Sequence, residues 1–259
     1  MRGFRLLAVV AGVLGGLTGV AYGLFTEQSR RARAVIGVPD APPLRADGVH
    51  GSGEGPPVRF AVLGDSMAAG LGVDDPAQLP GVVLANGLSD EVGVPVRLET
   101  HAISGSTTRD LVAQVDRVLA DPPDVALVVV GANDVTTRMS IPGSAALLGA
   151  QVRRLRDAGV GVVVGTCPDL GTVRPIAEPL RSVARDWSRR LARAQRVEVE
   201  RAGGVAVALG DLLAAEFRAR HADYFSGDRF HPSATGYEAA TSILLAPLCG
   251  VLRHEWWPR

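Results

Sequence analysis

Val-rich apolar runs alternate, from residue 58 onward, with stretches whose apolar residues recur at helical spacing. The runs are nearly continuous, which is typical of strands buried on both faces of a parallel sheet. The predicted strands are Val58–Leu63, Val96–Ala102, Val125–Val130, Val160–Gly165 and Val205–Ala208. The predicted helices are Leu79–Val92, Thr108–Leu119, Ser144–Asp157, Pro179–Ala202 and Ser233–Val251. Strands and helices joined by short connections predict a doubly wound α/β domain over residues 58–252.

The N-terminal region has a different pattern. The run Leu6–Phe25 holds 20 residues without a charge and follows Arg2 and Arg5. A helix of about 20 apolar residues spans a bilayer core, whereas a secretory signal has a shorter apolar region and a small-x-small cleavage site. We therefore expect an uncleaved membrane anchor over residues 1–25, with secretion as the alternative. Arg residues on both sides of the run leave its orientation open, and we expect the folded domain on the extracytoplasmic side.

The segment Gly37–Pro57 contains five Gly and five Pro in 21 residues and no aromatic residue. Such a composition buries too little apolar surface to offset the entropy of the chain. We therefore predict a linker over residues 26–57 that tethers the domain without fixing its orientation.

Charge and cysteine content exclude several classes of function. The formal net charge is zero, so no nucleic-acid partner is expected. The two cysteines, Cys167 and Cys249, lack the short spacing of a zinc site or a redox motif. We interpret them as small apolar residues, and a single disulfide between them stays open.

Polar residues follow the predicted strands. Ser66 comes directly after the first strand, Gly105 after the second and Asn133 after the third, while Asp228 and His231 precede the last helix. Each residue alone is more simply explained as a helix cap, a turn or a loop charge. Together they are expected at one edge of the sheet, because ligands of such folds bind outside the carboxyl ends of the strands.

This set of residue types matches the needs of acyl transfer. Ser66 is the candidate nucleophile, His231 the base that activates it, and Asp228 the acceptor that orients the imidazole. The backbone N–H groups of Ser66 and Gly105 and the side-chain amide of Asn133 are the candidate oxyanion donors. A side chain at Gly105 would be expected to obstruct the approach of the carbonyl group. A rival base, His101, lacks a carboxylate at short spacing.

Four short blocks resemble those of the SGNH hydrolases, also called the GDSL-like esterase/lipase family. They are "GDS" at 64–66, "ISGST" at 103–107, "GAND" at 131–134 and "DRFH" at 228–231, and Met67 stands where Leu is common. The resemblance covers about residues 58–250. It implies a flavodoxin-like three-layer α/β/α sandwich with a five-stranded parallel sheet. It also implies ester hydrolysis that needs no metal and no cofactor.

A membrane-tethered serine esterase or lipase acting on a small-molecule, lipid or glycan ester is therefore the expected function. The alternatives are an O-acyltransferase or deacetylase acting on an envelope glycan, and a catalytically silent binding module. The loops expected to select the substrate are Val135–Gly143, with Arg138, and Cys167–Pro179, with Arg174. Trp187 is expected in the core. Acyl length and oligomeric state stay open.

Overall fold

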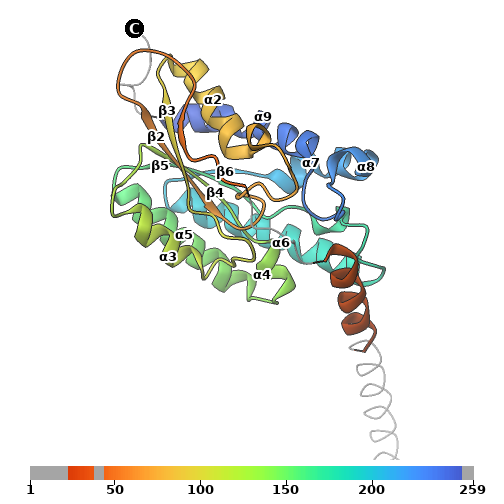
Figure 1. The fold of residues 1–259 in the computed structure, drawn as a ribbon. Helices are drawn as coiled ribbons and strands as arrows, with labels where there is room; N and C mark the ends of the chain where they lie inside the picture. The colour runs from red at the N-terminus through yellow and green to blue at the C-terminus, as the bar shows by residue number, and fades with distance from the viewer. Residues whose placement is uncertain (1–22, 38–43, 253–259) are drawn as a thin grey trace, which may run out of the picture.

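A computed structural model describes residues 23–37 and 44–252 of the chain. One sheet, drawn as arrows in Figure 1, has the strand order β1-β3-β2-β4-β5-β6. Its strands are β1 (Gly48–His50), β2 (Val58–Gly64), β3 (Val96–Thr100), β4 (Val125–Val129), β5 (Gly161–Gly165) and β6 (Val205–Val207). The sheet order of β2 to β6 is the order of flavodoxin-like folds, and all four of their pairings are parallel.

The prediction of five strands is one strand short. The sixth strand, β1, pairs antiparallel with β3, with Val49 opposite Arg97. It lies inside the Gly- and Pro-rich segment predicted to be a tether. The strand β1 is only three residues long, and Val49 is more than half exposed. It therefore has no apolar pattern that would predict a strand. Its order depends on backbone pairing with the free edge of β3, which composition does not reveal.

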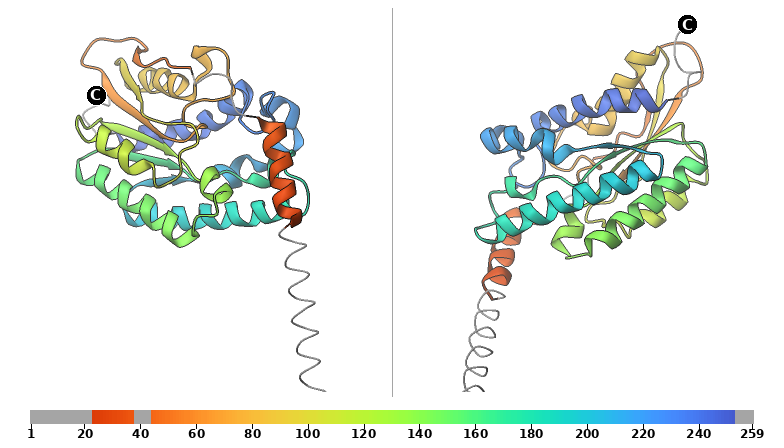
Figure 2. Two further views of the ribbon diagram at one scale, coloured as in Figure 1. Left: turned by 60° about the horizontal axis from the view of Figure 1, so that its bottom comes forward. Right: turned by 180° about the vertical axis from the view of Figure 1, so that it is seen from behind.

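Helices cover both faces of the sheet and make three layers (Figures 1 and 2). One face carries α2 (Pro80–Val92) and α9 (Ala234–Val251), and the other carries α3 (Leu111–Val118), α5 (Ile141–Asp157) and α6 (Leu180–Arg201). Shorter helices are α4 (Ala132–Thr136), α7 (Leu209–Ala219) and α8 (His221–Tyr224), with 3-10 turns η1 (Pro76–Gln78) and η2 (Leu170–Thr172). Separate apolar clusters fill the two interlayer spaces.

Local sequence explains where the main elements begin and why the central strands are buried. Every residue of β4 and β5 is buried, in agreement with their continuous Val-rich runs. The Ser140 hydroxyl accepts a hydrogen bond from Gly143 N at the start of α5, and the Ser233 hydroxyl accepts one from Gly236 N at the start of α9. Both serines therefore act as N-caps.

Residues 23–36 are helical and contact the α/β domain beside the start of α6 (Figures 1 and 2). Gln28 is buried; its Nε2 donates to Glu178 O at 2.5 Å, and Leu180 N donates to its Oε1 at 3.1 Å. The part of the predicted linker from residue 26 to 36 is thus an ordered helix, and it lacks the Gly and Pro residues on which the linker prediction was based. We call this segment helix 23–36.

The predicted span Leu6–Phe25 lies outside the described residues except for its last three positions. Within residues 23–37 and 44–252, no helix combines the length and the apolarity that crossing a bilayer requires. The membrane anchor therefore stays a prediction from sequence.

Candidate active site

Ser66 lies in a tight turn directly after β2. The turn begins at Gly64, whose φ of +134° belongs to a region that side chains rarely adopt, and a Cβ there would lie 1.8 Å from Val129 O. Asp65 N donates to the same carbonyl oxygen at 3.1 Å. Because only glycine fits at position 64, β2 can run tight against β4 and still deliver Ser66 to the carboxyl end of the sheet.

His231 joins Ser66 to Asp228. Its Nε2 lies 2.9 Å from the Oγ of Ser66, and its Nδ1 lies 2.5 Å from the Oδ2 of Asp228. Ser66 and His231 are both buried. The three side chains form one hydrogen-bonded chain from carboxylate to imidazole to hydroxyl, which is the arrangement that activates a serine oxygen as a nucleophile.

Asp228 is fixed by its own loop. Its Oδ1 accepts hydrogen bonds from Phe230 N at 2.8 Å, His231 N at 2.9 Å and the Ser226 hydroxyl at 2.8 Å. Partial burial alone would raise the pKa of Asp228. The hydrogen bonds from the His231 side chain and from the two backbone N–H groups outweigh burial and lower this pKa to about 2. Asp228 is therefore ionised at neutral pH and faces the imidazole as a carboxylate.

The candidate oxyanion donors lie in three segments that are linked by hydrogen bonds: the turn of Ser66, the loop of Gly105 and the start of α4, which carries Asn133. Ile103 N donates to Gly64 O at 3.1 Å, which holds the loop of Gly105 beside the Ser66 turn. The Nδ2 of Asn133 donates to Ser106 O at 2.9 Å and links the start of α4 to that loop. The structure thus gathers the Ser66, Gly105 and Asn133 segments at one edge of the sheet.

Gly105 adopts a backbone angle that favours glycine. A Cβ on Gly105 would have no protein atom within 4 Å, so packing within the protein does not require glycine there. Its φ of +83° does, because residues with a side chain incur a conformational penalty at that angle. The simpler explanation of Gly105 as a turn residue thus agrees with the structure, and obstruction of a substrate carbonyl stays a prediction.

His101 and the cysteines lie outside this hydrogen-bonded chain. The expectation that His101 lacks a carboxylate at short spacing is wrong, because the Oε2 of Glu99, two residues earlier, lies 3.5 Å from its Nε2. Burial lowers the pKa of His101. Cys167 and Cys249 are free thiols buried in different apolar clusters, so the structure contains no disulfide between them. Among the described residues, no three His, Cys, Asp or Glu side chains are grouped so as to hold a metal ion.

Gln114 is a supporting residue that sequence reasoning missed. This fully buried side chain on α3 accepts from Gly64 N at 2.8 Å and donates to Gly64 O at 2.9 Å and to the Ser106 hydroxyl at 3.2 Å. It therefore ties the Ser66 turn to the loop of Gly105. A polar residue on the buried face of an amphipathic helix was the available signal.

Two buried aspartates were also missed as supports. Asp65 accepts hydrogen bonds from Met67 N, at 3.0 Å, and from the backbone of Gly131, and burial raises its pKa to about 7. Asp134 accepts from Thr108 N at 2.8 Å and from the Ser144 hydroxyl at 2.5 Å. Each carboxylate joins segments that follow different strands. Asp65, next to Ser66, and Asp134, next to Asn133, therefore help to hold these segments of the site in place.

A flavodoxin-like sandwich that carries a Ser–His–Asp chain at its strand ends has the architecture of the SGNH hydrolases. The family model described as GDSL-like Lipase/Acylhydrolase matches residues 62–239. The chain is also 46% identical to the GDSL-like esterase Rv1075c of Mycobacterium tuberculosis, over 98% of this chain and 86% of that protein. The protein belongs to the GDSL-like lipase/acylhydrolase family, and this membership identifies it as an ester-hydrolysing enzyme.

Solved structures share the fold at low sequence identity. TesA superposes with a TM-score of 0.62 at 21% identity, over 75% of this chain and 99% of its own. A catalytic mutant of Axe2, an acetylxylan esterase from Geobacillus stearothermophilus, superposes with a TM-score of 0.57 at 22% identity, over 81% and 98% of the two chains. At these identities the likeness supports the fold alone.

Proposed function

We propose that the protein is a serine esterase or lipase in which Ser66, His231 and Asp228 act as the catalytic triad. The observation that carries this proposal is the continuous hydrogen-bonded chain from Asp228 through His231 to Ser66. An isolated helix cap or loop charge, the simpler explanation of each residue alone, does not require this chain.

The reaction follows from the positions of the two nitrogen atoms of His231. The Ser66 oxygen attacks the ester carbonyl carbon while its proton passes to Nε2 of His231, and a tetrahedral oxyanion forms. The same proton then passes to the leaving alcohol, and an acyl-serine remains. Water, deprotonated by His231, attacks the acyl group, and the carboxylic acid is released as the proton held by His231 returns to the Ser66 oxygen. Asp228 keeps the Nδ1–H of the imidazole in place and stabilises its charged form.

The backbone N–H groups of Ser66 and Gly105 and the Nδ2 of Asn133 are proposed to bind the oxyanion. Their support is the placement of the three segments at one edge, joined through Gly64 and Ser106. Such donors stabilise charge that develops only in the transition state.

We further propose that the run Leu6–Phe25 anchors the enzyme in a membrane, with its catalytic domain on the extracytoplasmic side. The support is the uncharged length of this run and the docking of helix 23–36, which continues from it, on the domain. A membrane-impermeant active-site probe tests this location. Labelling of Ser66 in intact cells is expected, and labelling only after lysis would contradict an extracytoplasmic domain. Resistance of the protein to alkaline extraction from membranes tests the anchor.

The full chain and its Ser66→Ala variant provide the main test of the activity. We expect the wild type to hydrolyse 4-nitrophenyl esters and to bind a fluorophosphonate probe covalently, and the variant to do neither while keeping its melting temperature. Probe labelling that persists in Ser66→Ala would show that the nucleophile is another residue. Product analysis with and without an added sugar alcohol separates hydrolysis from acyl transfer.

A further inference from the structure

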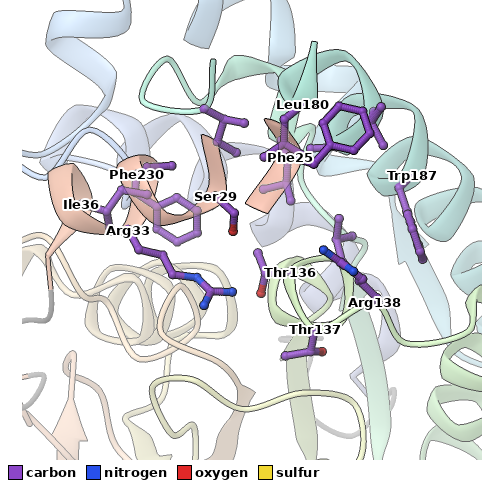
Figure 3. Close-up of a pocket in the computed structure, with 16 residues that line it drawn as sticks. Phe25, Ser29, Arg33, Ile36, Thr136, Thr137, Arg138, Leu180, Trp187 and Phe230 are labelled. Atoms are coloured by element: carbon purple, nitrogen blue, oxygen red, sulfur yellow. The ribbon is translucent and has the colours of Figure 1, made fainter. Parts of the chain in front are cut away.

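An apolar cavity of about 500 Å³ lies between helix 23–36 and the hydrolase domain (Figure 3). Helix 23–36 forms one wall with Phe25, Ala32 and Ile36, and α6 contributes Val183 and Trp187. Trp187, expected in the core, packs against a buried apolar cluster but is only half-buried, and it also lines this cavity. The volume lies within the range of small-molecule sites, about 300–1,000 Å³.

The cavity adjoins the proposed catalytic residues. Phe230 forms part of its lining, and the Phe230 ring contacts the His231 ring edge to face with centroids 4.9 Å apart. Val135, also in the lining, follows Asn133 by two residues on α4. The loop that places the imidazole and the helix α4 that carries the candidate oxyanion amide therefore each form part of the cavity wall.

The character of the lining points to a hydrocarbon chain with a polar end. Aliphatic and aromatic side chains dominate, and the charged members are the exposed Arg33 and Arg138. Figure 3 shows Arg33 extending from helix 23–36 and Arg138 lying near Thr136 on the opposite wall. Burial of a chain in such a lining removes apolar surface from water, which favours binding by about fourfold per methylene group.

We propose that this cavity binds the acyl chain of the ester substrate, with helix 23–36 as a wall that determines chain-length preference. The proposal rests on the proposed esterase function. Helix 23–36 lies outside residues 62–239, which match the family model, so this wall is an addition to the shared fold. Because helix 23–36 begins within the last three residues of the predicted membrane anchor, the acyl chain would enter near a membrane surface, where long-chain esters are concentrated.

Two tryptophan substitutions on one helix give a matched test. Ala32 is buried and lines the cavity, whereas Ala34, two residues on, is exposed. With the full chain in phosphatidylcholine vesicles, we compare kcat/KM for 4-nitrophenyl butyrate and 4-nitrophenyl decanoate. Ala32→Trp is expected to lower the decanoate value at least tenfold and the butyrate value less than twofold. Ala34→Trp is expected to leave both values within twofold.

Undocking of the helix gives a second test that adds no bulk. Gln28→Ala removes the hydrogen bonds to Glu178 O and Leu180 N, and we expect it to lower the ratio of decanoate to butyrate activity. Equal ratios in the wild type, Ala32→Trp and Gln28→Ala would refute the proposal. A loss of both activities in Ala32→Trp with a lowered melting temperature would show misfolding, and the Gln28→Ala ratio then decides.

Direct binding separates the cavity from the chemistry. In Ser66→Ala protein, a brominated decanoic acid is expected to quench the fluorescence of Trp187, and Trp187→Phe is expected to remove that quenching. Hydrolysis without this quenching and without a chain-length effect would overturn the cavity proposal. Quenching in a protein that hydrolyses no ester would overturn the proposed function and leave a chain-binding site.

Discussion

The Nε2 of His231 lies 2.9 Å from the Oγ of Ser66, although 165 residues separate them in the chain. The turn after β2 supplies the hydroxyl, and the loop before α9 supplies the imidazole. This contact exists only in the folded domain, and the proposed activation of Ser66 by His231 depends on it.

Replacement of Asp228 tests the orientation of the imidazole. Asp228→Asn keeps an oxygen that can accept from Phe230 N and His231 N, but it removes the carboxylate charge beside Nδ1. We expect kcat for a short-chain ester to fall by about 10²–10⁴-fold, with little change in melting temperature, because the imidazole loses its oriented, charge-stabilised form. Single-turnover kinetics measure the effect. An unchanged kcat would remove Asp228 from the triad.

Two substitutions at Gly105 test whether the backbone angle is what requires glycine at this position. At φ +83° asparagine is tolerated far better than valine, although neither side chain meets another atom at its Cβ. We expect Gly105→Asn to retain more activity than the Gly105→Val variant. The free energy of unfolding should fall by about 1–2 kcal/mol more in Gly105→Val. Denaturant titration and kcat measurements on both variants test this. Equal losses would contradict the conformational explanation.

The contrast between predicted and observed features has a physical cause. Strands such as β4 were predictable because burial on both faces leaves a continuous apolar run. The gathering of Ser66, Asn133 and His231 was expected because the carboxyl ends of parallel strands share one edge. In contrast, β1 and helix 23–36 depend on pairing with β3 and on hydrogen bonds of Gln28. Those contacts join distant segments, and local composition carries no trace of them.

Gln114 is expected to support both stability and catalysis. Gln114→Leu leaves the buried N–H of Gly64 without a partner, whereas Gly64 O keeps the hydrogen bond from Ile103 N. One unsatisfied buried group costs about 1–3 kcal/mol, so the free energy of unfolding should fall by about that amount. Because the loop of Gly105 also loses its bond through Ser106, kcat should fall more than KM rises.

A matched variant separates these two effects of Gln114. Gln195 is another fully buried glutamine, and it bonds Cys167 N and Val130 O without contacting Ser106. Gln195→Leu should lower the melting temperature comparably and reduce kcat less. If kcat falls in proportion to the loss of stability in both variants, Gln114 has no separate effect on catalysis through the loop of Gly105.

Asp65 gives the stability of the protein a pH dependence. Burial raises its pKa from about 3.8 to about 7 in the folded state, so between these values the folded protein binds a proton that the unfolded chain has released. The contribution of Asp65 to stability is therefore full below pH 3.8 and is lost as the pH rises towards 7. Above about pH 5, Asp228 adds no pH dependence, because it is ionised both in the folded state, where its pKa is about 2, and in the unfolded chain, where its pKa is about 3.8.

In Asp65→Asn this titration is absent. The difference in melting temperature, variant minus wild type, should therefore increase between pH 5 and pH 8. The expected increase is about 2–4 °C or more, which corresponds to a free-energy change of about 1 kcal/mol or more. A constant difference between the two melting temperatures over pH 5–8 would show that Asp65 does not titrate there.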